Sequence, residues 1–348
     1  MQEETLDIAW RASSCYRASI LFYIFAPLIV VAAGGCATVP AEEETAEGPE
    51  ATGNGQVTYS SENAQLGDTI RQAGAAGGNV VLMGGLEEEQ VGEVNFNEAP
   101  PQTVVSQLSE QAELAVEVTP HYSFLFPAEY EALANVSLEG QLHSTYEGVE
   151  TQIAFGAGTP LFVCLAWMSQ ATGVTIVADN EVAEAQSGEL ALGTAPLSTA
   201  LEALLKSARV ANFYVDSTEE YIFLYSGAQG HETDMLLNRP AMDQQQEAML
   251  EQRVTVYMPE PPSRPNELRM LPGATPLAEV LPSLSRQLGV RIVAEPGLEE
   301  LPVNPAVFQD VRVGTAMDLL IRQWLRPEYG YHAAHDRLVI RRRTPGEL

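Results

Sequence analysis

We predict an α+β protein built from three small tandem modules, each with the order βαββαβ. The first observation is an internal repeat: residues 159–179 (TPLFVCLAWMSQATGVTIVAD) align without a gap with residues 275–295 (TPLAEVLPSLSRQLGVRIVAE), with 10 identities in 21 positions. The second is that apolar residues at helical spacing alternate with short apolar runs typical of strands. The third is length, because 348 residues fit two or three domains of about 150 residues each.

The chain is strongly acidic. It has 47 acidic and 18 basic residues, a formal net charge of -29, and Lys206 as its single lysine. Such a charge repels phosphate backbones, so the composition argues against nucleic acid as a partner. The hydrophobic fraction of 45% is ordinary for a globular protein.

Residues 1–35 are predicted to be a lipoprotein signal peptide. An apolar run over 19–35 follows Arg11 and Arg17 and ends in small residues directly before Cys36. This arrangement resembles the lipobox of bacterial lipoproteins. The resemblance implies lipidation of Cys36 and, from the residues that follow it, attachment to the periplasmic face of the outer membrane. The alternative is an uncleaved helix that anchors a periplasm-facing protein in the inner membrane.

The next segments are a tether and a divergent first module. Residues 36–55 are acidic and poor in large apolar residues, which predicts a disordered tether. In module 1, residues 56–130, we expect helices near 66–76 and 99–114. Short strands are expected at 56–60, 79–83, 93–97 and 122–126.

Module 2 spans residues 151–226. Thr159 is expected to cap a helix whose first residue is Pro160, and Gly173 to end that helix. Pro196 is expected to open a second helix, with Leu197, Leu201 and Leu204 on one face. Strands are expected at 174–177, 189–195, 211–216 and 221–225.

A linker and module 3 complete the chain. Residues 227–266 are polar and proline-rich, which predicts a linker with one short helix near 242–251. In module 3, residues 267–343, Thr275 and Gly289 repeat the helix boundaries of module 2. The remaining expected elements are strands at 290–293 and 307–313, a helix with the stripe Met317, Leu320, Ile321 and Trp324, and a closing hairpin at 329–341.

The order VTIVAD, ELALGTAPLSTALEALL and YIFLYS in module 2 resembles the short N-terminal domain (N0 or STN) of secretins and of signalling TonB-dependent receptors. The resemblance covers roughly residues 56–343, but no counterpart of the secretin pore domain follows it before Leu348. It implies contacts with a secretin or with other subunits of an envelope machine, and a homo-oligomeric ring.

No sequence pattern points to catalysis, a cofactor or a metal. The chain has no GxSxG, HExxH, Walker, CxxC or EF-hand pattern. His332 and His335 fall at the expected final hairpin, where a solvated turn is the simpler interpretation. Cys164 is the single cysteine of the folded part, and we expect it to be a small buried apolar residue.

Two groups of residues are candidate interfaces. Phe162 and Trp167 make their helix apolar nearly all round, which favours either a partner or packing against a neighbouring module. The second group is basic and closes an acidic chain: Arg337, Arg341, Arg342 and Arg343. These arginines are expected either to protect an exposed strand edge or to dock on an acidic subunit.

The sequence thus predicts a non-enzymatic periplasmic lipoprotein. As an adaptor or scaffold of a secretin-type machine for secretion, type IV pili or uptake, it would act through protein–protein contacts. The alternative is a periplasmic module that binds a ligand, either a cell-wall glycan or a transported substrate.

Overall fold

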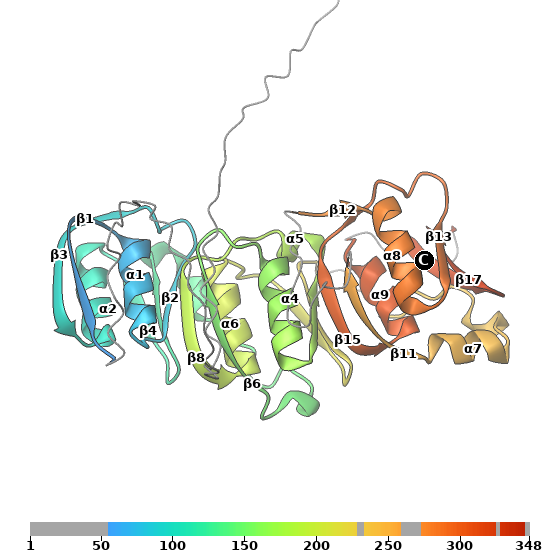
Figure 1. Cartoon of the computed structure of the whole chain (residues 1–348), viewed down its shortest axis with the longest axis horizontal. Helices are drawn as coiled ribbons and strands as arrows, with labels where there is room; N and C mark the ends of the chain where they lie inside the picture. Colours follow the sequence, from blue (N-terminus) through green and yellow to red (C-terminus); the bar gives the residue numbers. More distant parts are fainter. Residues whose placement is uncertain (1–54, 228–232, 259–272, 325–327, 345–348) are drawn as a thin grey trace, which may run out of the picture. The chain divides into compact units, whose positions relative to one another are not determined.

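The computed structural model describes residues 55–227, 233–258, 273–324 and 328–344 (Figure 1). All of them lie in Gly48–Leu348, the larger of the two compact parts of the chain. Three segments within this part are called the first, second and third units. The predicted signal peptide, Cys36 and the tether before Gly55 lie outside the described residues. Within the described ranges, no helix has the length and apolar character needed to cross a membrane.

The first unit, residues 57–126, contains two helices and five strands. Strand β1 pairs antiparallel with β3, and β5 pairs in parallel with β2 and antiparallel with β4. The elements are β1 (Val57–Gln65), α1 (Leu66–Ala75), β2 (Val80–Leu82), β3 (Gln90–Ala99), α2 (Pro101–Gln111), β4 (Ala115–Val118) and β5 (Ser123–Phe126).

The second unit, residues 150–225, has the same pairings. Strand β6 pairs antiparallel with β8, while β10 pairs in parallel with β7 and antiparallel with β9. The elements are β6 (Glu150–Phe155), α4 (Leu161–Thr172), β7 (Thr175–Ala178), α5 (Asn180–Ala183), β8 (Leu190–Pro196), α6 (Leu197–Ser207), β9 (Tyr214–Ser217) and β10 (Tyr221–Tyr225).

The third unit, residues 253–342, follows the same order. Strand β11 pairs antiparallel with β15, and β17 pairs in parallel with β13 and antiparallel with β16. The elements are β11 (Arg253–Met258), β12 (Thr275–Pro276), α8 (Leu277–Leu288), β13 (Arg291–Ala294), β14 (Pro302–Val303), β15 (Ala306–Arg312), α9 (Val313–Arg322), β16 (Tyr329–Ala334) and β17 (Arg337–Arg342).

The described residues therefore form a mixed structure of helices and several small sheets, as expected for the α+β class. One sheet crosses a unit boundary, because β2 of the first unit also pairs antiparallel with β8 of the second. This gives a five-stranded sheet of order β4-β5-β2-β8-β6, of which β4, β2, β8 and β6 are labelled in Figure 1. Apolar helix faces, such as that of Leu197, Leu201 and Leu204 on α6, are buried beneath these sheets.

The predicted helix ends are confirmed, whereas the predicted helix starts are displaced by one residue. Gly173 and Gly289 end α4 and α8 in the left-handed conformation, with φ of 71° and 66°. The helices begin one residue after each proline, and neither threonine caps them. Instead, the Thr159 hydroxyl donates to the Gly156 carbonyl oxygen (2.6 Å), and Thr275 belongs to β12.

Three regions differ from the sequence-based prediction. Strand β4 was not expected, because its residues AVEV are few and interrupted by a charge. Strand β11 lies inside the predicted linker 227–266, so the third unit begins before residue 267. The segment 127–149 contains the short helices η1 (Ala128–Tyr130), α3 (Glu131–Ala134) and η2 (Ser144–Tyr146) and contributes Leu133 and Leu138 to the core. Within the segment that precedes β11, η3 (Arg239–Ala241) and α7 (Gln244–Leu250) are formed.

Candidate functional site

The first and second units are joined by a close backbone contact. The Leu82 N–H donates to the Glu189 carbonyl oxygen (2.9 Å), which extends the ladder between β2 and β8. The Ser207 hydroxyl donates to the Leu82 carbonyl oxygen (3.0 Å) and accepts from the Gly188 N–H (2.9 Å). A side chain at Gly188 would overlap the backbone of Leu82, Met83 and Gly84, so only glycine fits there.

The single lysine of the chain is buried at this junction. Lys206, on α6, is 1% exposed, and its Nζ lies 2.8 Å from Glu117 Oε2 of β4 and 3.3 Å from Glu202 Oε1. Glu202 also accepts a hydrogen bond from the Tyr122 hydroxyl (2.7 Å). Burial together with this carboxylate raises the pKa of Tyr122, which therefore stays a neutral donor. Sequence composition drew attention to Lys206 but gave no sign of its burial.

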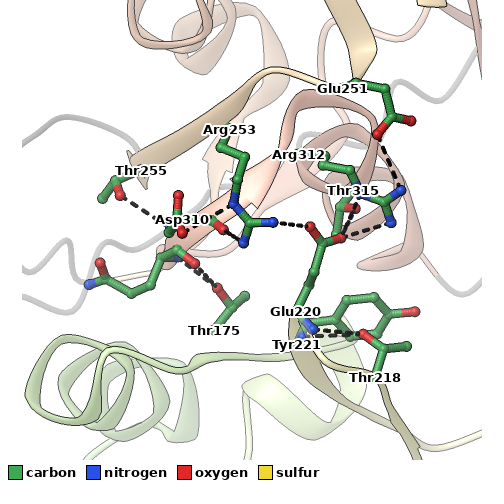
Figure 2. A network of polar contacts seen from close by, with 11 residues as sticks. Thr175, Thr218, Glu220, Tyr221, Glu251, Arg253, Thr255, Asp310, Arg312 and Thr315 are labelled. Atoms are coloured by element: carbon green, nitrogen blue, oxygen red, sulfur yellow. Dashed lines mark hydrogen bonds and ion pairs between the residues drawn. The ribbon is translucent and has the colours of Figure 1, made fainter. Parts of the chain in front are cut away.

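A second polar network joins the second and third units (Figure 2). Its centre is Glu220, whose side chain is 4% exposed and whose Oε2 accepts from the Thr315 hydroxyl (2.7 Å). Arg253 Nη1 lies 3.1 Å from Glu220 Oε1, and Arg312 Nε lies 2.9 Å from Glu220 Oε2. Arg253 also bonds Asp310. Both oxygens of the Glu220 carboxylate therefore accept hydrogen bonds, so the network joins the two units and Glu220 has no unbonded oxygen with which to act as a general base.

A buried arginine supports the same junction. Arg322 of α9 is fully buried, and its Nη1 lies 2.8 Å from Asp216 Oδ2 of β9. Its guanidinium stacks over the Phe223 ring, with 4.1 Å between the guanidinium carbon and the ring centroid. The Tyr221 hydroxyl donates to the same Asp216 oxygen (2.8 Å). A fully buried cation and a partly buried carboxylate therefore join the third unit to the second.

The apolar second face of α4 packs within the chain. Helix α4 contacts β15 of the third unit. Phe162 is 5% exposed and lines a cavity of about 10 Å³ together with Asn304 and Pro305. That volume holds at most about one water molecule, so it is no ligand pocket. Packing against a neighbouring unit accounts for Phe162, while Trp167 is half-buried on the same helix.

The four C-terminal arginines do not form one exposed cluster. Arg343 is buried, and its Nε donates to the Tyr329 carbonyl oxygen (3.0 Å). Arg341 is half-buried and donates to the Arg342 carbonyl oxygen (2.9 Å). Arg337 and Arg342 are exposed. Because β17 is the central strand of β13-β17-β16, the expectation that these arginines protect a strand edge is wrong.

The outer edge of β16 is bonded by a short extended segment of the same chain, residues 235–237. The Tyr331 N–H donates to the Met235 carbonyl oxygen (2.9 Å), and the Leu237 N–H donates to the Tyr331 carbonyl oxygen (2.8 Å). Leu236 bridges Tyr331 in parallel. Asp318 Oδ1 accepts from the Met235 N–H (2.9 Å), and desolvation raises the pKa of this carboxyl to about 7. The third unit thus shows how this edge accepts an extended segment.

The corresponding outer strands of the first and second units, β4 and β9, pair on one side only within the described residues. They also hold the large apolar side chains with the greatest exposure, Val118 of β4 at 77% and Tyr214 of β9 at 46%. Tyr214 stacks on Tyr225, with 5.4 Å between ring centroids. Exposed apolar side chains on an open edge are typical of a strand-accepting surface. Sequence analysis missed this surface, although an outer hairpin strand with an aromatic residue was visible.

Reactive groups are not gathered anywhere in the described part of the chain. There, no group of three or more histidine, cysteine or acidic side chains is arranged to hold a metal ion. Burial raises the pKa of the Cys164 thiol, which disfavours the reactive thiolate. His332 lies on β16 and His335 in the turn that follows it.

Comparison with known proteins gives no family assignment. No protein-family model, curated protein or solved structure matches the chain.

Proposed function

We propose that the chain is a non-enzymatic adaptor or scaffold of a secretin-type envelope machine. In this proposal, three N0/STN-like modules act through protein–protein contacts on the periplasmic face of the outer membrane, where Cys36 carries a lipid anchor. The recurrence of one set of strand pairings in the three units supports a repeated module. The sequence resemblance suggests its family, and fold-level analogy supplies the class of partner.

The main support for the proposal is a strand edge that is hydrogen-bonded by residues 235–237 in the third unit, while the equivalent edges, β4 and β9, are unpaired within the described residues. Residues 235–237 occupy the β16 edge, whereas β9 presents Tyr214 at the same edge of its sheet. An extended segment of a partner subunit can add to β9 in the same way, with backbone hydrogen bonds for affinity and the stacked tyrosines as an apolar contact. Several such edges on one chain suit a scaffold.

Replacing Tyr214 by aspartate is expected to weaken partner binding by about tenfold or more, because tyrosine is enriched among the few interface residues whose removal costs about 2 kcal/mol or more. The measurement is in-cell cross-linking from β9, followed by mass spectrometry of the captured envelope subunit. Tyr214→Phe retains the ring and is the matched control. Equal capture by the aspartate variant would contradict the proposal, and capture of a glycan in place of a protein would favour the ligand-binding alternative.

Replacing Cys36 by serine is expected to abolish labelling by a radioactive or clickable fatty acid and to release the protein from the outer-membrane fraction. The thiol is the atom that carries the lipid, and a serine hydroxyl does not replace it in this modification. Cys164→Ser is the control, since that thiol is buried in the folded part of the chain. Membrane retention of the Cys36 variant would show that an uncleaved helix anchors the protein.

A further inference from the structure

The two junctions inside the chain use strands at equivalent positions, which share one sheet at the first junction and belong to two contacting sheets at the second. In each, the strand after the first helix of one unit (β2 or β7) lies against the strand before the second helix of the next unit (β8 or β15). At the first junction, Asn79 Oδ1 accepts from the Gly193 N–H (2.9 Å). At the second, Thr175 Oγ1 accepts from the Gln309 N–H (2.6 Å). A short polar side chain thus makes one hydrogen bond at the corresponding place in each junction.

Asn79 and Thr175 occupy equivalent positions. Each stands four residues before the residue whose N–H bonds the last strand of its unit, Met83 to Leu125 and Asp179 to Leu224. The third unit has the same bond, from the Glu295 N–H to the Ile340 carbonyl oxygen. Counting back four residues gives Arg291 as the counterpart in the third unit. Thr175 Oγ1 both accepts from the Gln309 N–H and donates to the Gln309 carbonyl oxygen (3.3 Å), whereas an arginine can only donate, so its partner must carry acceptors.

The same two kinds of strand edge are open at the two ends of the array. Among the described residues, β13 pairs with β17 alone and β3 with β1 alone. Strand β7 is buried at all four positions, whereas β13 begins with exposed Arg291 and continues with half-buried Val293 and Ala294. Strand β3 buries Val91, Val94 and Phe96 and exposes most of its other residues. The β13 edge therefore corresponds to β2 and β7 of the internal junctions, and the β3 edge corresponds to β8 and β15.

The two open edges carry opposite charge. Arg291 lies beside Arg337 in the β13–β17 ladder, and Arg286 lies on α8, the helix before β13. All three arginines are exposed, and none has an ion pair within the described residues. On β3, Glu93 and Glu98 are exposed on either side of Asn97. The first unit, residues 57–126, contains ten acidic residues against one arginine. Carboxylates and carbonyl groups on β3 supply the acceptors that Arg291 needs.

We propose that copies of the chain associate head to tail, with the β13 edge of one copy against the β3 edge of the next. Arg291 then takes the position of Thr175 and meets Asn97, Glu93 and Glu98 of the following copy. Because this contact joins two different surfaces, it repeats from copy to copy and builds a ring or an open filament. The inference is independent of the proposed adaptor role, since it stands on the internal junctions and on charge alone.

Sedimentation velocity of the full chain in detergent tests the proposal. The native chain should form larger species as its concentration rises, and Arg291→Glu should raise the apparent Kd by about tenfold or more through charge repulsion. Combining Arg291→Glu with Glu93→Arg should restore association. Arg342→Glu makes the same charge change at the other end of β17 and should have little effect. Melting curves identify any variant that fails to fold.

A cross-link locates the contact. Mixed Arg291→Cys and Asn97→Cys chains should form a disulfide-linked dimer whose peptides join these two positions, and neither variant alone should give that peptide pair. A native chain that stays monomeric up to its solubility limit would overturn the proposal. So would an Arg342→Glu variant that dissociates as much as Arg291→Glu, or a cross-link absent from the mixture. Loss of an envelope partner leaves these readouts unchanged, so the two proposals fail separately.

Discussion

Replacing Gly188 by alanine is expected to destabilise the protein by about 3 kcal/mol, the upper end of the cost of overpacking. The new Cβ would overlap the Leu82 carbonyl oxygen and lie 2.8 Å from the Gly84 nitrogen and 2.9 Å from the Met83 carbonyl carbon. These are backbone atoms held by the β2–β8 pairing, so they cannot turn aside as a flexible side chain would. Urea unfolding followed by circular dichroism measures the loss.

Gly156→Ala is the matched control for this substitution. A Cβ at Gly156 meets no atom within 4 Å, and its backbone is not in the left-handed region. Alanine there is expected to change stability by less than about 1 kcal/mol. If both variants unfolded at the same urea concentration, the close approach of the two backbones at Gly188 would not exist in solution.

Replacing Lys206 by alanine is expected to cost about 3–5 kcal/mol, because it removes the cation from a buried ion pair. Glu117 and Glu202 would lose their shared partner at a place where Lys206 is 1% exposed. The Lys206 Nζ contact with the Ala134 carbonyl oxygen (3.4 Å) would also be lost. The midpoint of urea unfolding reports this cost.

A companion variant separates charge from packing at Lys206. Lys206→Met combined with Glu117→Gln keeps the volume of both side chains and removes both charges, and should recover most of the lost stability. If this pair were as unstable as Lys206→Ala, restoring the volume of the lysine stem would not offset the loss, and the contacts of the ammonium group would account for the effect.

The sequence predicts local structure well and the unit junctions poorly. Helix ends at Gly173 and Gly289 follow from glycine conformation, and the stripes on α6 and α9 follow from helical periodicity. The junctions depend on side chains that are more than eighty residues apart, such as Lys206 and Glu117 or Glu220 and Arg312. Helical or strand periodicity in one sequence does not indicate such distant pairs. Neither Lys206 nor Glu220, in the turn Glu219-Glu220, could therefore be predicted to form a buried contact.

For the candidate interface residues, the sequence indicated that α4 needs a second packing partner but did not identify that partner. The all-round apolar character of α4 correctly required a second packing surface, but periodicity does not distinguish a neighbouring unit from a partner. Phe162 packs at the junction with the third unit. The arginine cluster was inferred from adjacency in sequence, yet Arg343, one residue after the end of β17, is buried, whereas Arg337 is exposed. The open edges of β4 and β9 became visible only from strand order.

The shared sheet between the first and second units has a consequence for motion. Residues 127–149 lie between two units and resemble a hinge by position, but the β2–β8 hydrogen bonds run beside them. Rotation of one unit against the other would require those bonds to break, so it would coincide with local unfolding. The amide hydrogens of Val80 and Leu82 should therefore exchange with solvent as slowly as those of the second unit, and lengthening the 127–149 segment should give the first unit no additional freedom.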